Sequence, residues 1–290
     1  MKPAAVEESA LRRVAVLGAG TMGHGIAHAA AAAGFETCLY DVATEALAQA
    51  REAIDGIVSR GVELGKVSVT GAAGVINRLS FTTDLGLAVR EADFVIEAVP
   101  ERMGLKLEVL GAVERAAPAR AVLATNTSAL SVTEMAAALA APGRLAGMHF
   151  FNPVHKMKLV EVVRALETAP ATVEAIERVA RRMGKETVRV RESPGFVTSR
   201  VNALIGNEAF YMLEEGVASA RDIDTALRLG LNHPMGPFEL VDIVGLDTRL
   251  AVLEYLHATL GEKYRPCPLL VQYVQAGRLG RKVGRGVYEY

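Results

Sequence analysis

A glycine-rich segment near the N-terminus limits what this chain can fold into more than any other part of its sequence. Residues 18–23 (Gly-Ala-Gly-Thr-Met-Gly) follow a short apolar run at 14–17 and open an alanine-rich stretch that ends at Gly34. A second strand-like run, residues 35–40, comes next and ends at Asp41. A strand that turns through glycines into a helix and then into a second strand is a βαβ unit, which predicts a parallel sheet.

The glycine spacing matches the G-x-G-x-x-G pattern of loops that bind a dinucleotide. In that pattern Gly18 permits the tight turn, Gly20 lets the backbone approach a pyrophosphate, and Gly23 lets the helix pack closely on the strand. The N–H groups and the positive dipole end of the helix then favour the phosphates. The pattern alone has low specificity, but the preceding strand and the following helix supply the context it requires. The predicted cofactor-binding residues of this loop are Gly18, Gly20, Thr21, Met22 and Gly23.

Asp41 supplies the acidic residue that a dinucleotide site needs about 20 residues after its first glycine. A carboxylate at this point accepts hydrogen bonds from the 2′-hydroxyl of a ribose and repels a 2′-phosphate. Residues 42–45 contain no Arg or Lys that could bind such a phosphate. These features predict a nicotinamide or flavin cofactor, and NAD rather than NADP. Alternatively, Asp41 only caps the following helix, because Asp is a favoured N-cap residue.

The α/β pattern continues to residue 192. Further strands are expected at residues 93–99, 121–125, 146–151 and 187–191, with helices between them at 105–117, 132–140 and 173–183. Residues 44–77 carry charges at helical spacing and several glycines. They are predicted to form a helical hairpin that projects from the sheet.

Beyond the Ser-Pro-Gly sequence at 193–195 the strand-like runs disappear. Helices are expected at residues 200–215, 220–229, 244–260 and 269–276. The chain is therefore predicted to be an α/β protein with a Rossmann-type, doubly wound parallel sheet in residues 1–192 and a smaller all-α domain in residues 193–290. The helices of this second domain carry more apolar residues than one thin layer buries, which predicts a homodimer through it.

The charge balance argues against nucleic acid and membrane surfaces as partners. The 290 residues include 32 Lys and Arg against 33 Asp and Glu, and the net charge is −1. Neither predicted domain has a basic excess that would attract a polyanion. The longest run with almost no polar residue, residues 26–35, is about half of the ~20 residues that cross a bilayer. The first ten residues are expected to form a loose tail without the features of a signal peptide.

Cysteine and histidine usage gives no sign of a metal centre or a disulfide framework. The two cysteines, Cys38 and Cys267, lie far apart and outside any metal-type spacing. The histidines also form no ligand spacing with acids or cysteines, so no metal is predicted. A reduced, cytoplasmic protein fits this pattern.

Three polar residues are expected to lie close to the cofactor. His149 falls at the end of the strand predicted at 146–151, and Ser128 follows the strand predicted at 121–125. Doubly wound sheets bind their ligands outside these strand ends. Glu161 has apolar residues on both sides, so it is expected to be partly buried and to need a partner. A His–Glu pair with a nearby hydroxyl suits general acid–base chemistry, although His149 alone would also fit a hydrogen-bonded core position.

Seven motifs in a fixed order carry a more specific signal. They are Gly-Ala-Gly-Thr-Met-Gly at 18–23, Val-Ile-Glu-Ala-Val-Pro-Glu at 95–101, Asn-Thr-Ser at 126–128, His-Phe-Phe-Asn-Pro-Val at 149–154, Met-Lys-Leu-Val-Glu-Val-Val at 157–163, Pro-Gly-Phe-Val at 194–197 and His-Pro-Met-Gly-Pro-Phe-Glu-Leu at 233–240. The chain from about residue 13 to residue 290 resembles the L-3-hydroxyacyl-CoA dehydrogenase family, most closely its stand-alone bacterial 3-hydroxybutyryl-CoA dehydrogenases. The resemblance implies NAD-dependent, reversible oxidation of the 3-hydroxyl of a short-chain (S)-3-hydroxyacyl-CoA, as in fatty-acid beta-oxidation.

The resemblance also implies catalytic roles for individual residues. His149 would act as the general base that removes the 3-hydroxyl proton, with Glu161 holding the imidazole and Ser128 binding the substrate oxygen. The family commonly has Asn where this chain has Ser199, which offers one short hydroxyl in place of an amide. Ser199 is expected to bind the thioester or the histidine.

Further residues are assigned to the cofactor and the substrate. The family-implied contacts near the ribose of the cofactor are Glu101, Lys106 and Asn126. The predicted substrate contacts besides Ser128 are Asn152, Arg60 and Lys66. The two cations would meet the phosphates of coenzyme A, or alternatively they are ordinary solvated charges.

Two other functions stay open at this stage. A relative on the same scaffold could oxidise a hydroxy acid that carries no CoA, such as L-gulonate. A crystallin-like structural protein could bind NAD without turnover, because a fold by itself does not define an activity. The presence of Ser128, His149 and Glu161 favours an enzyme.

Overall fold

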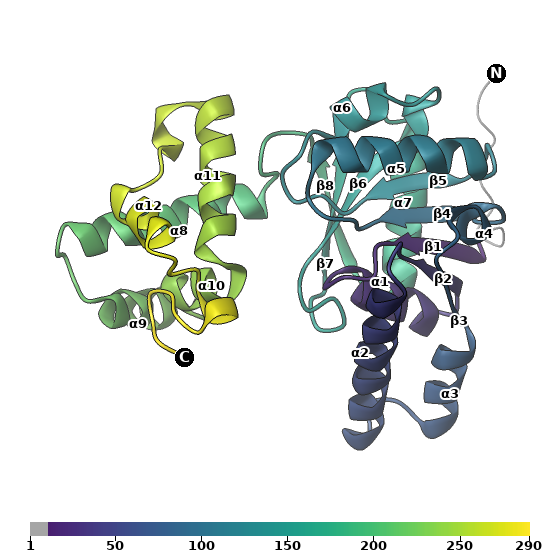
Figure 1. Ribbon diagram of the computed structural model, residues 1–290, viewed down its shortest axis with the longest axis horizontal. Helices are drawn as coiled ribbons and strands as arrows, with labels where there is room; N and C mark the ends of the chain where they lie inside the picture. The colour runs from purple at the N-terminus through teal and green to yellow at the C-terminus, as the bar shows by residue number, and fades with distance from the viewer. Residues whose placement is uncertain (1–10) are drawn as a thin grey trace. The chain divides into compact units, whose positions relative to one another are not determined.

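The structure, a computed structural model, describes residues 11–290 (Figure 1). Residues 1–10, for which the sequence predicts a loose tail, lie outside the described residues. The chain divides into two compact units, the first ending at Glu192 and the second running from Ser193 to Tyr290. This division falls where the sequence pattern changes from α/β to all-α.

An eight-stranded sheet forms the centre of the first unit. Its strands are β1 (Arg13–Leu17), β2 (Glu36–Tyr40), β3 (Leu79–Thr82), β4 (Phe94–Glu97), β5 (Val122–Thr125), β6 (Leu145–Phe150), β7 (Leu159–Arg164) and β8 (Glu186–Arg191). Their order is β3-β2-β1-β4-β5-β6-β7-β8, and all neighbouring pairs are parallel except β6 and β7. The predicted Rossmann-type, doubly wound fold is confirmed, and the strand order reverses between β1 and β4.

Helices cover both faces of this sheet. The α-helices of the first unit are α1 (Gly23–Ala32), α2 (Thr44–Glu63), α3 (Val69–Asn77), α4 (Leu85–Val89), α5 (Met103–Ala116), α6 (Val132–Ala137) and α7 (Pro170–Arg182). In Figure 1, α5 lies in front of the sheet and α7 behind it. The central strands β4, β5 and β6 are buried along their whole length, which is why they read as near-continuous apolar runs.

The sequence does not predict β3 and β7. β3 is a short edge strand of half-buried and exposed residues, so no apolar pattern marks it. β7 is not predicted because Glu161 interrupts its apolar residues. Such a strand is stable in a core only if the carboxylate has a partner. β7 also departs from the expected parallel direction. The connection from β6, residues 151–158, is shorter than the crossover of about a dozen residues that a parallel neighbour needs.

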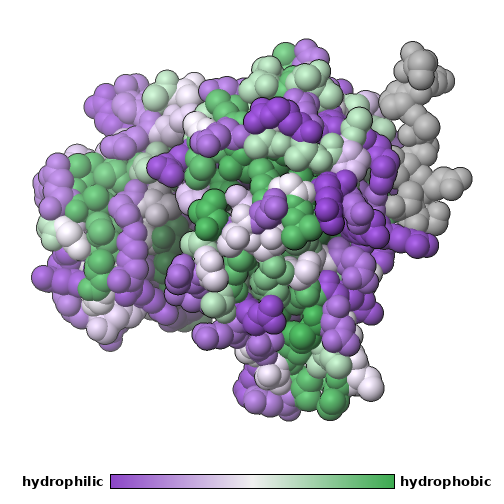
Figure 2. Space-filling view, turned by 45° about the vertical axis from the view of Figure 1, so that its right-hand side comes forward, coloured by the Kyte–Doolittle hydropathy of each residue, from purple (hydrophilic) through white to green (hydrophobic). Residues whose placement is uncertain are grey.

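The predicted hairpin consists of α2 and α3 and projects from the sheet in Figure 1. One face of α2 is buried at the spacing of a helix by Leu47, Ala50, Ile54 and Val58. The hydroxyl of Ser68 caps α3 by accepting a hydrogen bond from the N–H of Gly71 at 3.0 Å. Figure 2 shows hydrophobic and hydrophilic residues side by side on this projection, at the bottom of the view.

The second unit is helical. Its α-helices are α8 (Thr198–Glu214), α9 (Ala220–Gly230), α10 (Pro237–Val244), α11 (Leu246–Leu260) and α12 (Pro268–Gln275). Phe210 packs edge-to-face on Phe238, with the ring centroids 5.1 Å apart. The sequence does not predict α10, because Pro237 belongs to a Pro/Gly cluster, but here this proline occupies the first turn of the helix, where proline is favoured. Gly245, at a φ of +102°, separates α10 from α11.

Two further expectations from the sequence concern the cysteines and the apolar helices of the described residues. Cys38 and Cys267 are free thiols, and burial raises the pKa of both. Between residues 11 and 290 no helix combines the length and the apolar character that crossing a membrane requires.

We expect Gly56→Ala to stabilise the first unit by about 1 kcal/mol, because Gly56 lies exposed within α2 and a Cβ there would meet no atom within 4 Å. Gly65→Ala is the matched control. Gly65 follows α2 at a φ of +64°, a conformation that costs alanine about 1 kcal/mol. Thermal unfolding followed by circular dichroism should give a higher midpoint for the first variant and a lower midpoint for the second. A lower midpoint for Gly56→Ala would contradict the helical conformation of α2 at this residue.

Candidate active site

Three glycines shape the turn between β1 and α1. Gly18 has a φ of +98°, and a Cβ on it would lie 2.6 Å from the carbonyl oxygen of Ala98. A Cβ on Gly23 would lie 1.6 Å from the carbonyl oxygen of Gly18. At Gly20, in contrast, a Cβ would meet no atom within 4 Å. Gly18 and Gly23 are therefore required by the turn itself, whereas the open space at Gly20 suits the close approach of a pyrophosphate.

The start of α1 is open to an anion. Its N-cap residue is Met22, and no side chain caps the first turn. The N–H groups of this turn therefore have no side-chain partner, and they lie at the positive end of the helix dipole. Thr21, directly before the N-cap, is exposed.

Asp41 connects the glycine loop to the end of β2. Its Oδ2 accepts a hydrogen bond from the N–H of Ala19 at 2.8 Å, and its Oδ1 accepts one from the N–H of Ala43 at 3.0 Å. The alternative in which Asp41 is the N-cap of the next helix is wrong, because the N-cap of α2 is Ala43. The carboxylate, the open backbone at Gly20 and the uncapped α1 together fit a dinucleotide.

His149 and Glu161 face each other across two antiparallel strands. They are directly paired in the register of β6 and β7. Nδ1 of His149 lies 2.7 Å from Oε2 of Glu161. The histidine is 5% exposed and the glutamate is completely buried. The ring of Phe151 lies next to the imidazole, with the centroids 4.6 Å apart. The partner that the sequence required for Glu161 is thus the imidazole, in surroundings where charges interact strongly.

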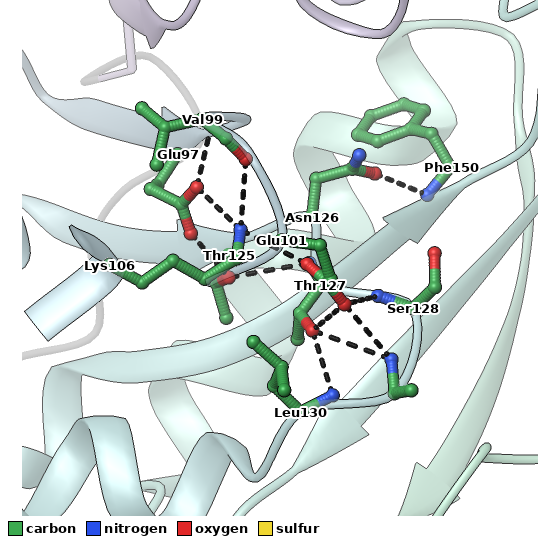
Figure 3. A network of polar contacts seen from close by, with 11 residues as sticks. Glu97, Val99, Glu101, Lys106, Thr125, Asn126, Thr127, Ser128, Leu130 and Phe150 are labelled. Atoms are coloured by element: carbon green, nitrogen blue, oxygen red, sulfur yellow. Dashed lines mark hydrogen bonds and ion pairs between the residues drawn. The ribbon is translucent and has the colours of Figure 1, made fainter. Parts of the chain in front are cut away.

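A second buried cluster lies at the ends of β4 and β5 (Figure 3). Oε1 of Glu97 accepts hydrogen bonds from Nζ of Lys106 at 2.7 Å and from the N–H of Val99 at 2.8 Å. Its Oε2 accepts one from the hydroxyl of Thr125 at 2.6 Å. Lys106 Nζ also lies 3.4 Å from Oε2 of Glu101. Lys106 is only 1% exposed, so its ammonium belongs to this cluster rather than to the surface.

Glu101 and Asn126 hold the loop that follows β5. Oε1 of Glu101 accepts hydrogen bonds from the hydroxyl of Thr127 at 2.5 Å and from the N–H of Ser128 at 2.9 Å. Oδ1 of Asn126 accepts one from the N–H of Phe150 at 2.8 Å, which joins the end of β5 to the end of β6. In Figure 3 the Ser128 hydroxyl points away from Glu101. The structure therefore brings Glu101, Lys106, Asn126 and Ser128 together.

The sequence interpretation misses three members of this cluster, Glu97, Thr125 and Thr127. All three side chains are buried. Glu97 could have been found, because a carboxylate within an apolar run needs a buried partner just as Glu161 does. Thr125 carries no such signal, since threonine is common in strands without any polar role, and Thr127 lies in the loop after β5 with no charge to mark it.

Arg60 and Lys66 line a groove of about 1010 Å³ between the hairpin, α1 and the chain at residues 155–156. Arg60 forms an exposed ion pair with Glu63 at 2.7 Å, and Lys66 is exposed. The groove is also lined by Arg78, Lys156, His28 and His155, and none of the residues lining it is acidic. Burial, together with the nearby His155, Lys185 and His24, lowers the pKa of His28 to about 4.

The remaining predicted site residues lie elsewhere. Asn152 is exposed in the connection that follows β6. Ser199 lies in the first turn of α8, in the second unit. No group of three or more potential metal ligands occurs within residues 11–290.

The two units correspond to the two parts of one protein family. The sequence model for the NAD-binding domain of 3-hydroxyacyl-CoA dehydrogenases matches residues 13–193, and the model for their C-terminal domain matches residues 195–290. The chain belongs to the 3-hydroxyacyl-CoA dehydrogenase family. It is therefore an oxidoreductase, and its cofactor is NAD, as the glycine loop and Asp41 predict. The resemblance found in the sequence is confirmed.

Similar proteins span both units. A probable 3-hydroxybutyryl-CoA dehydrogenase of Bacillus subtilis (strain 168) is 48% identical over 281 residues, which cover 97% of this chain and 98% of that protein. The 3-hydroxybutyryl-CoA dehydrogenase of Bradyrhizobium diazoefficiens is 41% identical over 97% of this chain and 96% of its own. The crystal structure of (S)-3-hydroxybutyryl-CoA dehydrogenase PaaH1 from Ralstonia eutropha matches with a TM-score of 0.93 at 40% identity, over 97% of this chain and 99% of that one.

Gly20→Ala and Gly23→Ala should separate cofactor binding from folding. An alanine at Gly20 meets no protein atom but occupies space next to the pyrophosphate, so we expect an unchanged unfolding midpoint and an about 10-fold higher Kd for NAD. An alanine at Gly23 collides with the backbone of Gly18 and should lower the midpoint. Calorimetric NAD titration and thermal unfolding provide the two measurements. Unaltered NAD affinity in Gly20→Ala would show that the pyrophosphate does not approach this loop.

Proposed function

We propose that this chain catalyses the reversible, NAD-dependent oxidation of short-chain (S)-3-hydroxyacyl-CoA, such as 3-hydroxybutyryl-CoA, to 3-oxoacyl-CoA. The observation that carries the proposal is the buried pair of His149 and Glu161 at the carboxyl end of β6, in the unit that contains the NAD loop. The substrate class is supported by full-length relatives named as 3-hydroxybutyryl-CoA dehydrogenases.

His149 would take up the proton of the 3-hydroxyl and return it in the reverse direction. Its Nδ1–H donates to Glu161, which fixes the ring orientation and makes Nε2 the basic nitrogen of the neutral imidazole. When the ring becomes protonated, its positive charge lies beside a carboxylate in a buried environment that strengthens their attraction. NAD, when bound, supplies the acceptor for the hydride that leaves carbon 3.

Three hydroxyl and amide side chains are assigned to the substrate. Ser128 would donate a hydrogen bond to the oxygen on carbon 3, since its hydroxyl points away from the Glu101 cluster. Asn152, exposed after β6, would bind the acyl part of the substrate. Ser199, at the start of α8, would take the place of the asparagine common in the family.

The NAD contacts fall into two groups. Asp41 would bind the ribose of the adenosine half, next to the glycine loop with which it shares a hydrogen bond. Glu101 and Asn126 would hold the other ribose, and Lys106, whose ammonium is buried, would act on it through Glu101. Among these three, Glu101 has 42% of its side chain exposed, so its carboxylate is accessible to a ribose hydroxyl.

The groove beside the hairpin would hold the coenzyme A part of the substrate. Arg60 and Lys66 supply positive charge for the phosphates. Ile57, Val58 and Val75 supply apolar surface for the adenine ring. The exposed pair of Arg60 with Glu63 contributes little stability and can be exchanged for a phosphate contact.

The second unit would form a homodimer interface. Its exposed apolar side chains include Val201, Leu229, Leu231, Ile243 and Val244. Burial of such side chains against a second copy would be favourable. We also propose a cytoplasmic location and a role in fatty-acid beta-oxidation, which agree with two free cysteines and with an acyl-CoA substrate.

A spectrophotometric assay tests the proposed reaction. The protein is mixed with NAD and (S)-3-hydroxybutyryl-CoA, and NADH formation is followed, with (R)-3-hydroxybutyryl-CoA and L-gulonate as comparison substrates. We expect turnover of the (S)-CoA ester alone. Turnover of L-gulonate alone would replace the proposal by a dehydrogenase of free hydroxy acids. NAD binding without turnover of any substrate would favour a structural protein.

Substitutions at the buried pair should lower kcat. We expect His149→Ala to lower kcat about 10³-fold, because proton transfer loses its base, and Glu161→Gln about 100-fold, because the imidazole loses its orienting charge. The matched control is Glu177→Gln, since Glu177 is also buried but binds Arg189 and Arg181 away from the site. Wild-type kcat in His149→Ala would refute the acid–base assignment.

Substitutions in the groove should raise KM. In Arg60→Ala and Lys66→Ala we expect an about 10-fold higher KM for the CoA ester, unchanged kcat, and a weaker dependence of KM on salt, because each removes a phosphate contact. Arg115→Ala, which removes an exposed arginine from the last turn of α5, serves as the control. If Arg60→Ala and Lys66→Ala both retain the wild-type KM, the groove does not bind coenzyme A.

A further inference from the structure

The proposed chemistry does not use Glu97, although this carboxylate lies beside the site. It ends β4 with no exposed surface, and Lys106 of α5 faces it with 1% exposed. A buried ion pair is a poor way to stabilise a fold, since apolar side chains of similar volume often serve as well or better. The pair lies at the carboxyl ends of β4 and β5, where a doubly wound sheet binds its ligands. A role in the site is therefore the better explanation.

The orientation of the Glu97 carboxylate is fixed by three partners. Oε1 accepts from Lys106 Nζ at 2.7 Å and from the N–H of Val99 at 2.8 Å. Oε2 accepts from the hydroxyl of Thr125 at 2.6 Å. The partners come from the strand end after Glu97 itself, from α5 and from β5, so the carboxylate joins three segments at one point.

Lys106 connects this carboxylate to the loop after β5. Its ammonium lies 2.7 Å from Glu97 and 3.4 Å from Oε2 of Glu101. The other oxygen of Glu101 accepts hydrogen bonds from the N–H groups of Ser128 at 2.9 Å and Ala129 at 3.3 Å. One buried cation is thus shared by two carboxylates, and one of these carboxylates holds the loop (Figure 3).

We propose that Glu97 is a positioning residue for Ser128. By binding the Lys106 ammonium, Glu97 limits the pull of this cation on Glu101, so Glu101 keeps its hydrogen bonds to the loop. The Ser128 hydroxyl then stays turned away from the carboxylate, as Figure 3 shows. The inference rests on the substrate-binding role proposed above for Ser128, and Glu97 itself would touch neither substrate nor cofactor.

The first test is Glu97→Gln, which keeps the shape of the side chain and removes its charge. The amide can still accept from Lys106 and donate to the Thr125 hydroxyl, but Lys106 is left with Glu101 as its one carboxylate. We expect about 10-fold faster hydrogen–deuterium exchange at the amides of residues 128–129, and an about 10-fold lower kcat. The pH profile of kcat should keep its shape, because the His149–Glu161 pair is untouched.

A second substitution in the same variant distinguishes positioning from general damage to the core. Glu97→Gln combined with Lys106→Met removes the unbalanced cation, so Glu101 is no longer pulled from the loop. Exchange at residues 128–129 should return to within about twofold of the wild-type rate. Wild-type exchange in Glu97→Gln, or equally fast exchange in the single and double variants, would overturn the proposal.

Glu177→Gln is the matched control, because Glu177 is a buried carboxylate of the same unit with Arg189 at 2.6 Å and Arg181 at 3.0 Å. It should lower the unfolding midpoint without changing kcat or the exchange of the loop. If it reproduces both effects of Glu97→Gln, the role of Glu97 is merely structural.

Thr127→Val provides a second route if Glu97→Gln does not fold. It removes the hydroxyl that donates to Glu101 and that accepts from the N–H groups of Ala129 and Leu130, and it leaves the ion pair of Glu97 and Lys106 intact, so it tests whether these loop bonds position Ser128. The same faster exchange and lower kcat are expected, and wild-type values for both would overturn the proposal. The exchange measurement needs no substrate. Absence of 3-hydroxyacyl-CoA oxidation in the wild-type protein would therefore refute the proposed function, while the loop measurement still tests the effect of Glu97.

Discussion

The antiparallel pairing of β6 with β7 is the contact on which the proposed chemistry depends. It sets His149 directly opposite Glu161, at a separation of 2.7 Å between Nδ1 and Oε2. A buried carboxylate without a partner would cost several kcal/mol, and an unoriented imidazole would be a poor base. The strand pairing removes both problems with one hydrogen bond. β7 and β8 run opposite to the other six strands, and this reversal is what sets the imidazole and the carboxylate face to face.

A second pair of opposite charges organises the neighbouring strand ends. Glu97 and Lys106 are buried at the ends of β4 and β5, and Glu101 extends the cluster to the loop that carries Ser128. Asn126 links the same loop to β6 through the N–H of Phe150. Three strand ends are therefore joined by hydrogen bonds to side chains. A site held by such bonds is preorganised, which lowers the reorganisation needed when substrate and cofactor bind.

The sequence predicts the parts of the fold that depend on local patterns. The turn at residues 18–23 and the carboxylate of Asp41 are recognisable because the glycine spacing reflects steric limits within a few residues. The hairpin of α2 and α3 is predicted because its charged residues repeat at helical spacing, and the buried face of α2 repeats at the same spacing. The strand β3 and the helix α10 are not predicted, since one lies half-buried at the sheet edge and the other begins with a proline in a Pro/Gly cluster.

The sequence by itself determined the α/β class, the NAD loop, the division near residue 192 and the family. It also indicated that Glu161 needs a partner, because a carboxylate among apolar residues is costly wherever the chain folds. The family resemblance named His149 as this partner, but only the tertiary structure decided how the two residues meet, across antiparallel strands, and that Glu97, Lys106 and Glu101 form one cluster with the Ser128 loop. Strand direction, register and the sharing of one ammonium depend on residues that are distant in sequence, and no local pattern records such contacts.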